Sequence, residues 1–304
     1  MSINPSLLSG RFVTQQALVL VSYGNQGVVE TADGEQIDVH YRRSVGRPFC
    51  GDRVLVEGEK GRLQVSRILP RTNVFARADN RQQKQVIAAN LEQVLVVVAP
   101  RPEPSRDLVE RYLVAAHSLE IEPVIVLNKV ELIDSTLSPD SPLARMDEYR
   151  QLGYTVIRTS CKTRPGTAEM LPVLDGRVSI LAGQSGVGKS SLVNELIPDL
   201  ELQTGALSRV TGKGTHTTTT TIMYRLPEDG RLLDSPGVWE YGLWKIEQSL
   251  LAHGFIEFRP YLGRCKFNDC RHEAEPRCAI RQAVDEGPIR DWRYQSYLRL
   301  LKQS

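Results

Sequence analysis

One stretch of the chain combines glycines, a lysine and serines in a spacing that suits phosphate binding. It fits the pattern G-x-x-x-x-G-K-[ST]. The glycines let the backbone turn tightly, so that successive N–H groups face phosphate oxygens. Lys189 can reach the β- and γ-phosphates, and the Ser190 hydroxyl can bind Mg²⁺. The pattern predicts a nucleotide site formed by Gly183, Gln184, Ser185, Gly186, Val187, Gly188, Lys189, Ser190 and Ser191.

Two shorter motifs indicate which base the nucleotide carries. Asn128-Lys129-Val130-Glu131 resembles the N-K-x-D motif with which GTPases select guanine, with Glu131 where Asp is usual. A carboxylate there accepts hydrogen bonds from N1–H and the exocyclic amine of guanine, a donor pair that adenine lacks. Lys129 would pack along the base plane. Ser160-Cys161-Lys162 resembles the accompanying S-A-K motif, whose backbone contacts the guanine carbonyl.

Two further segments resemble the switches that sense the γ-phosphate. His216-Thr217-Thr218 resembles the first switch, in which one threonine ligates Mg²⁺, and either Thr217 or Thr218 can take that role. Asp234-Ser235-Pro236-Gly237 resembles the second switch, D-x-x-G. Asp234 would hold Mg²⁺ through water, and the Gly237 N–H would touch the γ-phosphate. Val238 stands where many GTPases place a water-orienting Gln, so we expect slow intrinsic hydrolysis, with His216 or a partner positioning the water.

Four metal-binding side chains lie close together near the end of the chain. They are Cys265, Cys270, His272 and Cys278. Three thiols and one imidazole match a closed tetrahedral zinc site, and cysteines clustered in a cytosolic chain favour metal binding over disulfides. Because no coordination position is left open, the ion would be structural and would hold together a module too small to fold alone.

The nucleotide motifs need a parallel sheet to position them. Apolar runs at 94–99, 124–127 and 178–182 predict buried strands, and a guanine motif and the phosphate loop follow two of them. Helical patterns lie between the strands, one capped by Ser105 and one across 141–152. This alternation implies a doubly wound sheet with its ligand at the carboxyl ends of the strands. Because the guanine motifs precede the phosphate loop, the domain would be circularly permuted.

Five short strands between residues 17 and 68 predict a small closed barrel at the N-terminal end. An OB-type and an SH3-like barrel would look much the same from the sequence. Oligonucleotide binding fits a cluster of basic side chains, although a purely structural barrel is an alternative. The cluster comprises Arg42, Arg43, Arg47 and Arg53. Residues 70–89 are polar and basic and predict a linker.

Composition and charge bound the partners. The chain has 304 residues, of which 41% are hydrophobic, enough for two or three domains. No apolar run approaches a membrane span or a signal peptide, so we expect a cytoplasmic protein. Residues 41–84 hold eleven Lys and Arg against four Asp and Glu, and residues 255–304 hold ten against seven. Basic flanks favour a polyanionic partner, although solvated surface charge explains either flank alone.

In combination, these motifs resemble the ribosome small-subunit-dependent GTPase family, RsgA, over the whole chain. The resemblance implies a multidomain α/β protein. We expect an OB-like barrel over 1–75, a linker over 76–90, a circularly permuted GTPase domain with a doubly wound sheet over 91–248, and a zinc-binding helical domain over 249–304. It also implies GTP hydrolysis with Mg²⁺ in late maturation of the small ribosomal subunit. The flanking domains would bind ribosomal RNA while GTP is bound, the subunit would stimulate hydrolysis, and hydrolysis would release a monomeric protein.

Two other classes of function fit the phosphate loop taken by itself. One is an ATP-using enzyme such as a small kinase, because the loop does not choose the base. The other is a binding protein that holds the nucleotide only as a structural ligand. Asn128 and Glu131 argue against the first class. Lys189, Ser190 and Asp234 argue against the second.

Overall fold

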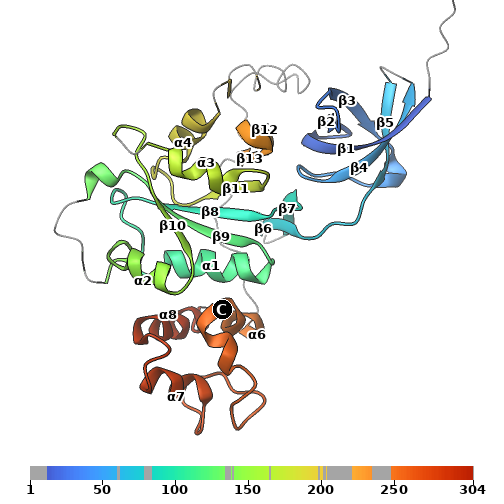
Figure 1. The fold of residues 1–304 in the computed structure, drawn as a ribbon. Coiled ribbons are helices and arrows are strands. Elements are labelled where there is room, and N and C mark those ends of the chain that lie inside the picture. Colours follow the sequence, from blue (N-terminus) through green and yellow to red (C-terminus); the bar gives the residue numbers. More distant parts are fainter. Residues whose placement is uncertain are drawn as a thin grey trace, which may run out of the picture.

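A mainly parallel sheet forms the middle of the molecule (Figure 1). In spatial order its strands are β10 (Thr155–Arg158), β9 (Glu122–Leu127), β8 (Gln93–Val98), β11 (Val178–Ala182), β13 (Arg231–Asp234) and the antiparallel β12 (Ile222–Arg225). Every residue of β8 is buried, as in a central strand that is covered on both faces. The computed structural model describes residues 12–59, 62–78, 84–133, 138, 140–163, 166–197, 199–200, 203, 221–234 and 248–303.

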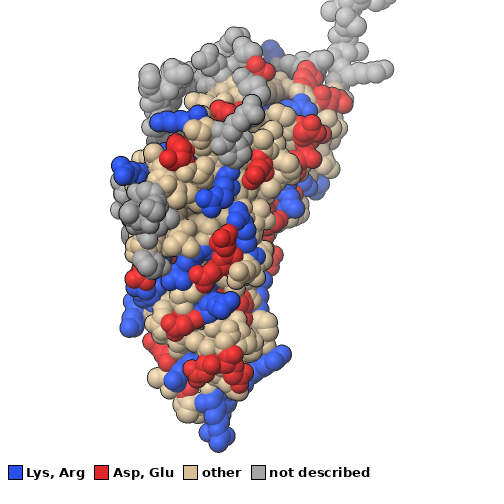
Figure 2. Space-filling view, turned by 60° about the vertical axis from the view of Figure 1, so that its left-hand side comes forward, with Lys and Arg blue, Asp and Glu red and all other residues tan. Residues whose placement is uncertain are grey.

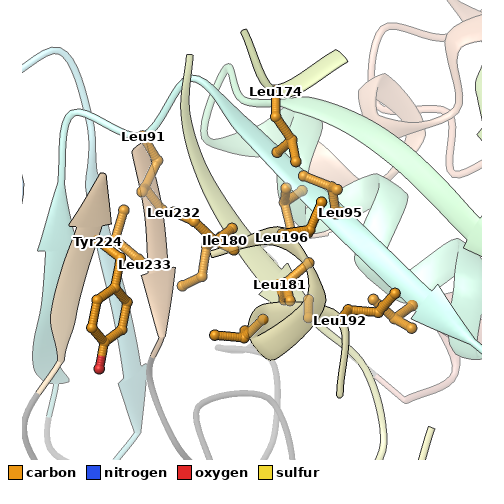
Figure 3. Close-up of a cluster of buried hydrophobic side chains, with 14 of the residues drawn as sticks. Leu91, Leu95, Leu174, Ile180, Leu181, Leu192, Leu196, Tyr224, Leu232 and Leu233 are labelled. Carbon is orange, nitrogen blue, oxygen red and sulfur yellow. The ribbon is translucent and has the colours of Figure 1, made fainter. Parts of the chain in front are cut away.

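Helices cover both faces of this sheet, which confirms the doubly wound arrangement. They are α1 (Leu108–Ser118), α2 (Met146–Gln151), α3 (Leu171–Leu174) and α4 (Lys189–Leu196). In Figure 1, α1 and α4 lie on opposite faces. Leu192 and Leu196 of α4 pack in one buried cluster with Leu95 and Ile180 of the central strands (Figure 3). The core therefore fixes the start of α4, where the phosphate loop ends.

Short 3₁₀ helices connect several of these elements. They are η1 (Arg43–Val45), η2 (Val130–Leu132), η3 (Pro142–Arg145), η4 (Ala168–Met170), η5 (Pro227–Asp229), η6 (Ala252–Gly254) and η7 (Ile256–Tyr261). The helix expected across 141–152 is η3 continued by α2. The expected cap of α1 is wrong: its N-cap is Asp107, whose carboxylate bonds Arg299, while Ser105 contributes only its carbonyl, to the Leu108 N–H.

A closed five-stranded barrel of the OB-like kind precedes the sheet, as predicted. Its strands are β1 (Phe12–Tyr23), β2 (Gln26–Thr31), β3 (Gln36–Tyr41), β4 (Arg53–Glu59) and β5 (Arg62–Ile68). Strand β1 pairs antiparallel with both β2 and β4, and β3 pairs parallel with β5, which closes the barrel. Inward-facing valines fill it, among them Val19, Val29, Val54, Val56 and Val65, which are all fully buried.

The segment expected to be a linker carries a β-hairpin instead. Strands β6 (Val74–Ala78) and β7 (Lys84–Ala89) pair antiparallel. Phe75, Ile87 and Ala88 are buried in the same cluster as the central strands. The basic residues between 70 and 84 hide this short apolar content, which explains why composition alone gives a linker.

The barrel is joined to the central sheet. Val21 of β1 pairs with Ile222, the first residue of β12, so that eleven strands form one continuous sheet. A buried ion pair between Glu30 of β2 and Arg231 of β13 reinforces the junction. The barrel therefore contacts the two strands that follow and precede the expected switch segments.

The C-terminal module packs beneath α1 (Figure 1). It contains α6 (Gln248–Leu251), α7 (Ala279–Asp285) and α8 (Asp291–Leu301), together with η6 and η7. Phe255, Phe258, Ile280 and Tyr297 lie in its own buried cluster. Gly254 permits close contact with α1, because a Cβ at this position would lie 2.5 Å from the Val114 side chain.

Candidate nucleotide-binding site and metal centre

The phosphate loop connects the carboxyl end of β11 to the first turn of α4. Gly188 is the N-cap of α4 in a left-handed conformation, with φ at 98°. The Lys189 ammonium donates to the carbonyls of Gly183 and Gln184, at 2.7 Å in each case. The side chain therefore lies over its own loop, where triphosphate oxygens would accept hydrogen bonds in place of the carbonyls. Backbone N–H groups and the positive end of the α4 dipole add to the attraction for anions.

Two loop glycines are required by close contacts. A Cβ at Gly183 would lie 2.2 Å from the Val97 carbonyl oxygen, and a Cβ at Gly188 would lie 2.4 Å from the amide nitrogen of Asn128. Both residues also have positive φ angles, of 145° and 98°, which side-chain-bearing residues rarely adopt. The loop can hold this shape only with glycine at these two positions.

The first guanine motif lies directly against the phosphate loop. Asn128 follows β9 and is 2% exposed, and its side-chain amide donates to the Val187 carbonyl at 2.9 Å. Its side-chain oxygen is buried and has no hydrogen-bond partner among the described residues. Lys129 donates to the carbonyls of Arg101 and Gly186. Base motif and phosphate loop are thus held as one unit, with a buried amide group available to a ligand.

The second guanine motif follows the neighbouring strand β10. Ser160 is fully buried, and its hydroxyl accepts from the N–H groups of Lys162 and Thr163 at 3.1 and 3.0 Å. A hydrogen bond with that hydroxyl lowers the pKa of the exposed Glu131 carboxyl, and Lys162 and Lys129 lower it further. Glu131 is therefore ionised at neutral pH and can act as a pure acceptor. An ionised acceptor at this place is what guanine's N1–H and amine require.

Asp234 brings the second switch to the phosphate loop. It is the last residue of β13, adjacent and parallel to β11. Burial raises the pKa of its carboxyl, and the nearby Lys189 ammonium opposes that shift. The carboxylate therefore lies within electrostatic reach of the lysine that would bind the phosphates. Ser190, Asp234 and phosphate oxygens are hard oxygen ligands of the kind that Mg²⁺ prefers.

Four of the expected catalytic residues lie outside the described part of the chain. They are His216, Thr217, Thr218 and Gly237. The strands on either side of these segments are described, since β12 starts at Ile222 and β13 ends at Asp234. Strand β13 adjoins β11, the phosphate loop's own strand, and the start of β12 pairs with the end of β13 through Ile222 and Asp234.

The four expected metal ligands converge in the C-terminal module. Their donor atoms all lie within 4.8 Å of one another. The sulfurs of Cys265 and Cys278 are 3.9 Å apart, and the His272 Nδ1 lies 3.5 and 3.4 Å from them. Zinc–sulfur bonds of about 2.3 Å in a tetrahedron place ligand sulfurs about 3.8 Å apart. The donor set and its spacing therefore fit a tetrahedral zinc ion.

Two tyrosines of α8 hold the metal-binding loop. The Tyr294 hydroxyl donates to the His272 carbonyl and the Tyr297 hydroxyl to the Arg271 carbonyl, both at 2.7 Å. The Ala279 N–H lies 3.4 Å from the Cys265 sulfur. Nothing in the sequence spacing identifies these supports, because they come from a helix that follows the last ligand by 13 residues.

A buried charge network fixes the C-terminal module against α1, and sequence analysis missed it. Arg293 of α8 is fully buried and bonds Glu257 at 2.5 Å, with Glu110 of α1 at 3.5 Å. The guanidinium also lies 4.5 Å from the Phe255 ring centroid. At the edge of this interface, Arg299 forms a bidentate pair with Asp107. In the sequence, α8 shows only an amphipathic pattern, in which a buried arginine is unexpected.

The loop after β8 is a second feature that the motifs did not reveal. Its Arg101 carbonyl accepts from Lys129, and Pro102 lies 3.5 Å from where a Gly186 Cβ would be. The loop thus supports the tip of the phosphate loop from outside. The only sequence signal is a Pro-x-Pro-x-Pro run directly after a buried strand.

Comparison with known proteins agrees with this architecture. The RsgA GTPase family profile matches residues 68–244. The chain is similar to the crystal structure of YjeQ from Thermotoga maritima, with 31% sequence identity, a TM-score of 0.78, and coverage of 96% of this chain and 98% of that one. It is also similar to the crystal structure of YloQ, described as a circularly permuted GTPase, with 25% identity, a TM-score of 0.76, and coverage of 99% and 97%.

The matched family segment is more than half of the chain, and the likeness to YjeQ extends over nearly all of it. This decides against an ATP-using kinase and against a protein that holds its nucleotide only as a structural ligand. In the part of the chain that the structure describes, no helix is long and apolar enough to cross a membrane. The order of motifs, the closed barrel and the Cys₃His cluster all agree with the family match. The chain belongs to the RsgA GTPase family and is a circularly permuted GTP hydrolase.

Proposed function

We propose that this GTPase acts in late maturation of the small ribosomal subunit. In its GTP-bound form it binds ribosomal RNA through the barrel and the C-terminal module. The assembled subunit stimulates hydrolysis, and the GDP form leaves. One observation carries the nucleotide dependence: the barrel pairs through Val21 with Ile222, at the start of the strand that follows the first switch segment. A conformational change in that segment would reach the RNA-binding barrel directly through this strand pairing.

The proposed roles follow the geometry of the site. Asn128, Lys129 and Glu131 bind guanine, assisted by the loop of Ser160, Cys161 and Lys162. The loop from Gly183 to Ser191 binds the phosphates. Ser190 and Asp234, with Thr217 or Thr218, hold Mg²⁺, which neutralises the charge that develops on the phosphates. The Gly237 N–H contacts the γ-phosphate, and His216 or the subunit orients the attacking water.

The C-terminal module is proposed to be held by one structural zinc ion on Cys265, Cys270, His272 and Cys278. With Arg293 and Arg299 bonded to residues of α1 and the preceding loop, this module moves with the GTPase domain. We therefore assign the nucleotide-dependent movement to the barrel side of the molecule. The proposed division is a barrel over 1–75, a connection over 76–90 that carries most of the β6–β7 hairpin, a GTPase domain over 91–248 and a zinc domain over 249–304.

The test is hydrolysis of GTP and of ATP, each with and without purified small ribosomal subunits. We expect slow turnover of GTP alone that rises at least about a hundredfold with subunits, as electrostatic completion of a GTPase site by a partner can supply. Lys189→Ala should abolish turnover in both conditions. If added subunits leave the GTP turnover unchanged, the proposed ribosomal role is wrong. Equal hydrolysis of ATP and GTP would contradict the assignment of Asn128 and Glu131 to guanine recognition.

A further inference from the structure

A cavity of about 450 Å³ opens beside the metal-binding loop of the C-terminal module. One wall is the loop from Cys265 to His272, and the opposite walls come from η6 and from α8. A single water molecule takes about 30 Å³, so the cavity is far larger than an ion site needs. Cys278, the most buried of the three ligand thiols, is not part of its lining. The other three ligands, Cys265, Cys270 and His272, do line it, so the cavity adjoins the metal centre and extends beyond it.

An aromatic side chain stands at this cavity in a fixed position. Phe267 lines the cavity and is 39% exposed, one of the few large apolar side chains so exposed among the described residues. A turn in which the Cys270 N–H donates to the Phe267 carbonyl at 3.3 Å sets its backbone. The metal ligands Cys265 and Cys270 bracket the turn, so a bound ion would hold both of its ends. The ring is therefore presented on a rigid support.

The charge around the ring suits a polyanion. The Lys266 ammonium lies 5.2 Å from the Phe267 ring centroid, in a cation–π arrangement that leaves the other ring face without this cation. Arg264 and Arg271 flank the loop and are exposed, and Asp269 is the one acidic residue from 264 to 272. Figure 2 shows basic side chains projecting at the lower tip of the molecule, which the C-terminal module forms.

We propose that this cavity binds one unpaired base of a single-stranded RNA segment. The base stacks on the face of Phe267 that Lys266 does not cover, and the flanking phosphates are neutralised by Lys266 and Arg264. Asn268 and Asp269 offer donors and acceptors to the base edge. An aromatic face with cations at its rim is the common platform for single-stranded nucleic acid, because every base has a π-face. A peptide, which lacks a phosphate backbone, would gain less electrostatic attraction from these positively charged residues at the edge of the cavity. This inference rests on the proposed RNA binding and names a site for it.

The test uses the full-length, zinc-loaded protein with a non-hydrolysable GTP analogue. Affinity is measured for purified small subunits and for a fluorescein-labelled single-stranded RNA decamer. Phe267→Ala should weaken both by about tenfold, the loss expected when one stacked base is given up, whereas Phe267→Trp should retain wild-type affinity. Leu171→Ala is the matched control, because Leu171 is 38% exposed but lies on α3 of the GTPase domain. Ultraviolet crosslinking and mass spectrometry should place a nucleotide on Phe267 in the wild type.

The outcomes separate this inference from the proposed function. Zinc content and basal GTP turnover should be unchanged in all three variants. If wild type binds subunits and Phe267→Ala binds equally well, the base site is wrong and the ribosomal role stands. If Phe267→Ala loses subunit binding but the crosslinks lead to a protein, the occupant is a peptide and the RNA assignment is wrong. If wild type binds neither subunits nor RNA, both fail together.

Discussion

The side-chain amide of Asn128 occupies the space in which a side chain at Gly188 would begin. The distance from its nitrogen to the ideal Cβ position is 2.4 Å. Asn128 belongs to the expected base motif and Gly188 to the phosphate loop, 60 residues further along the chain. The same amide donates to the Val187 carbonyl. Base recognition and phosphate binding therefore share one contact, which neither motif reveals alone.

This contact predicts that Gly188→Ala abolishes nucleotide binding. The added methyl group would displace Asn128, break its bond to Val187 and distort the loop at once. Gly153→Ala is a matched control, because its φ of 97° equals that of Gly188 within a degree while no atom lies within 4 Å of the added Cβ. Binding of a fluorescent GDP analogue should be lost in the first variant and retained in the second. Equal loss in both would mean that backbone strain, and not the Asn128 contact, is decisive.

Glu131 should decide which purine is bound. Glu131→Gln keeps the length of the side chain but replaces one acceptor oxygen by a donor. The N1–H and amine of guanine would then face the NH₂ group of the glutamine. We expect affinity for GDP to fall by about two orders of magnitude, since hydrogen bonds to charged groups contribute about 1.5–3 kcal/mol each. Xanthine carries a carbonyl where guanine carries its amine, so affinity for XDP should rise. Competition of GDP, XDP and ADP against a fluorescent GDP analogue measures the affinity for each of the three nucleotides.

The control for this change is Glu195→Gln, an exposed carboxylate on α4 that lies near Cys161. It changes charge near the same pocket without removing the proposed acceptor. Base preference should stay with GDP in this variant. If Glu131→Gln and Glu195→Gln behave alike, general electrostatics govern affinity and Glu131 does not read the base.

Much of the fold could be predicted from local patterns. Strand β3 of the barrel alternates apolar and polar residues, and the continuous apolar runs of β8 and β9 mark strands buried on both faces. Bonding geometry fixes the residue types and spacing of the phosphate loop and of the Cys₃His cluster, so both can be identified from short stretches of sequence. The apolar spacing of the final helix, Asp291–Leu301, is also visible in the sequence, because one face of the helix packs on the module core.

The remaining features depend on contacts between distant segments. The β6–β7 hairpin is expected to be a linker because its buried residues are few and the sequence around them is polar and basic. Asp107 caps no N–H group of α1, because its carboxylate serves Arg299, 192 residues away. Arg293 gives no local sign that it is buried. Such features arise from tertiary packing, which one-dimensional periodicity does not encode.

Arg293 should be essential for docking of the C-terminal module. Arg293→Ala would leave Glu110 and Glu257 buried without their cation, and burial already raises the pKa of Glu110. Removing one partner of a buried ion pair costs about 3–5 kcal/mol. Thermal unfolding followed by circular dichroism should show a large fall in midpoint, with Arg290→Ala, its exposed neighbour, close to wild type. Equal midpoints for the two variants would contradict a locking role.

The metal centre should hold one zinc ion per chain. Cys278→Ser removes a buried ligand, so the bound zinc measured by mass spectrometry should fall to near zero and the C-terminal module should become sensitive to protease. Cys161→Ser removes a thiol outside the cluster and should leave the stoichiometry at one. Zinc retained in full by Cys278→Ser would mean that the four residues do not form the site.

His117 should make the α1 interface sensitive to acid. Burial lowers the pKa of its imidazole to about 4, and the nearby Arg259 and Arg293 act in the same direction, while Glu257 opposes them. Its Nε2 lies 3.2 Å from the Tyr154 hydroxyl. Because the folded-state pKa lies below the unfolded value of about 6.5, the contribution of the imidazole to folding stability is complete above that pH and is lost as the pH falls toward 4.

His117→Gln cannot take up this proton, so its unfolding midpoint should fall less steeply between about pH 6.5 and 4 than that of the wild type. Other acid effects, such as loss of zinc, are common to both proteins and cancel in the difference. Parallel pH profiles would show that His117 is already solvated and does not couple protonation to this interface.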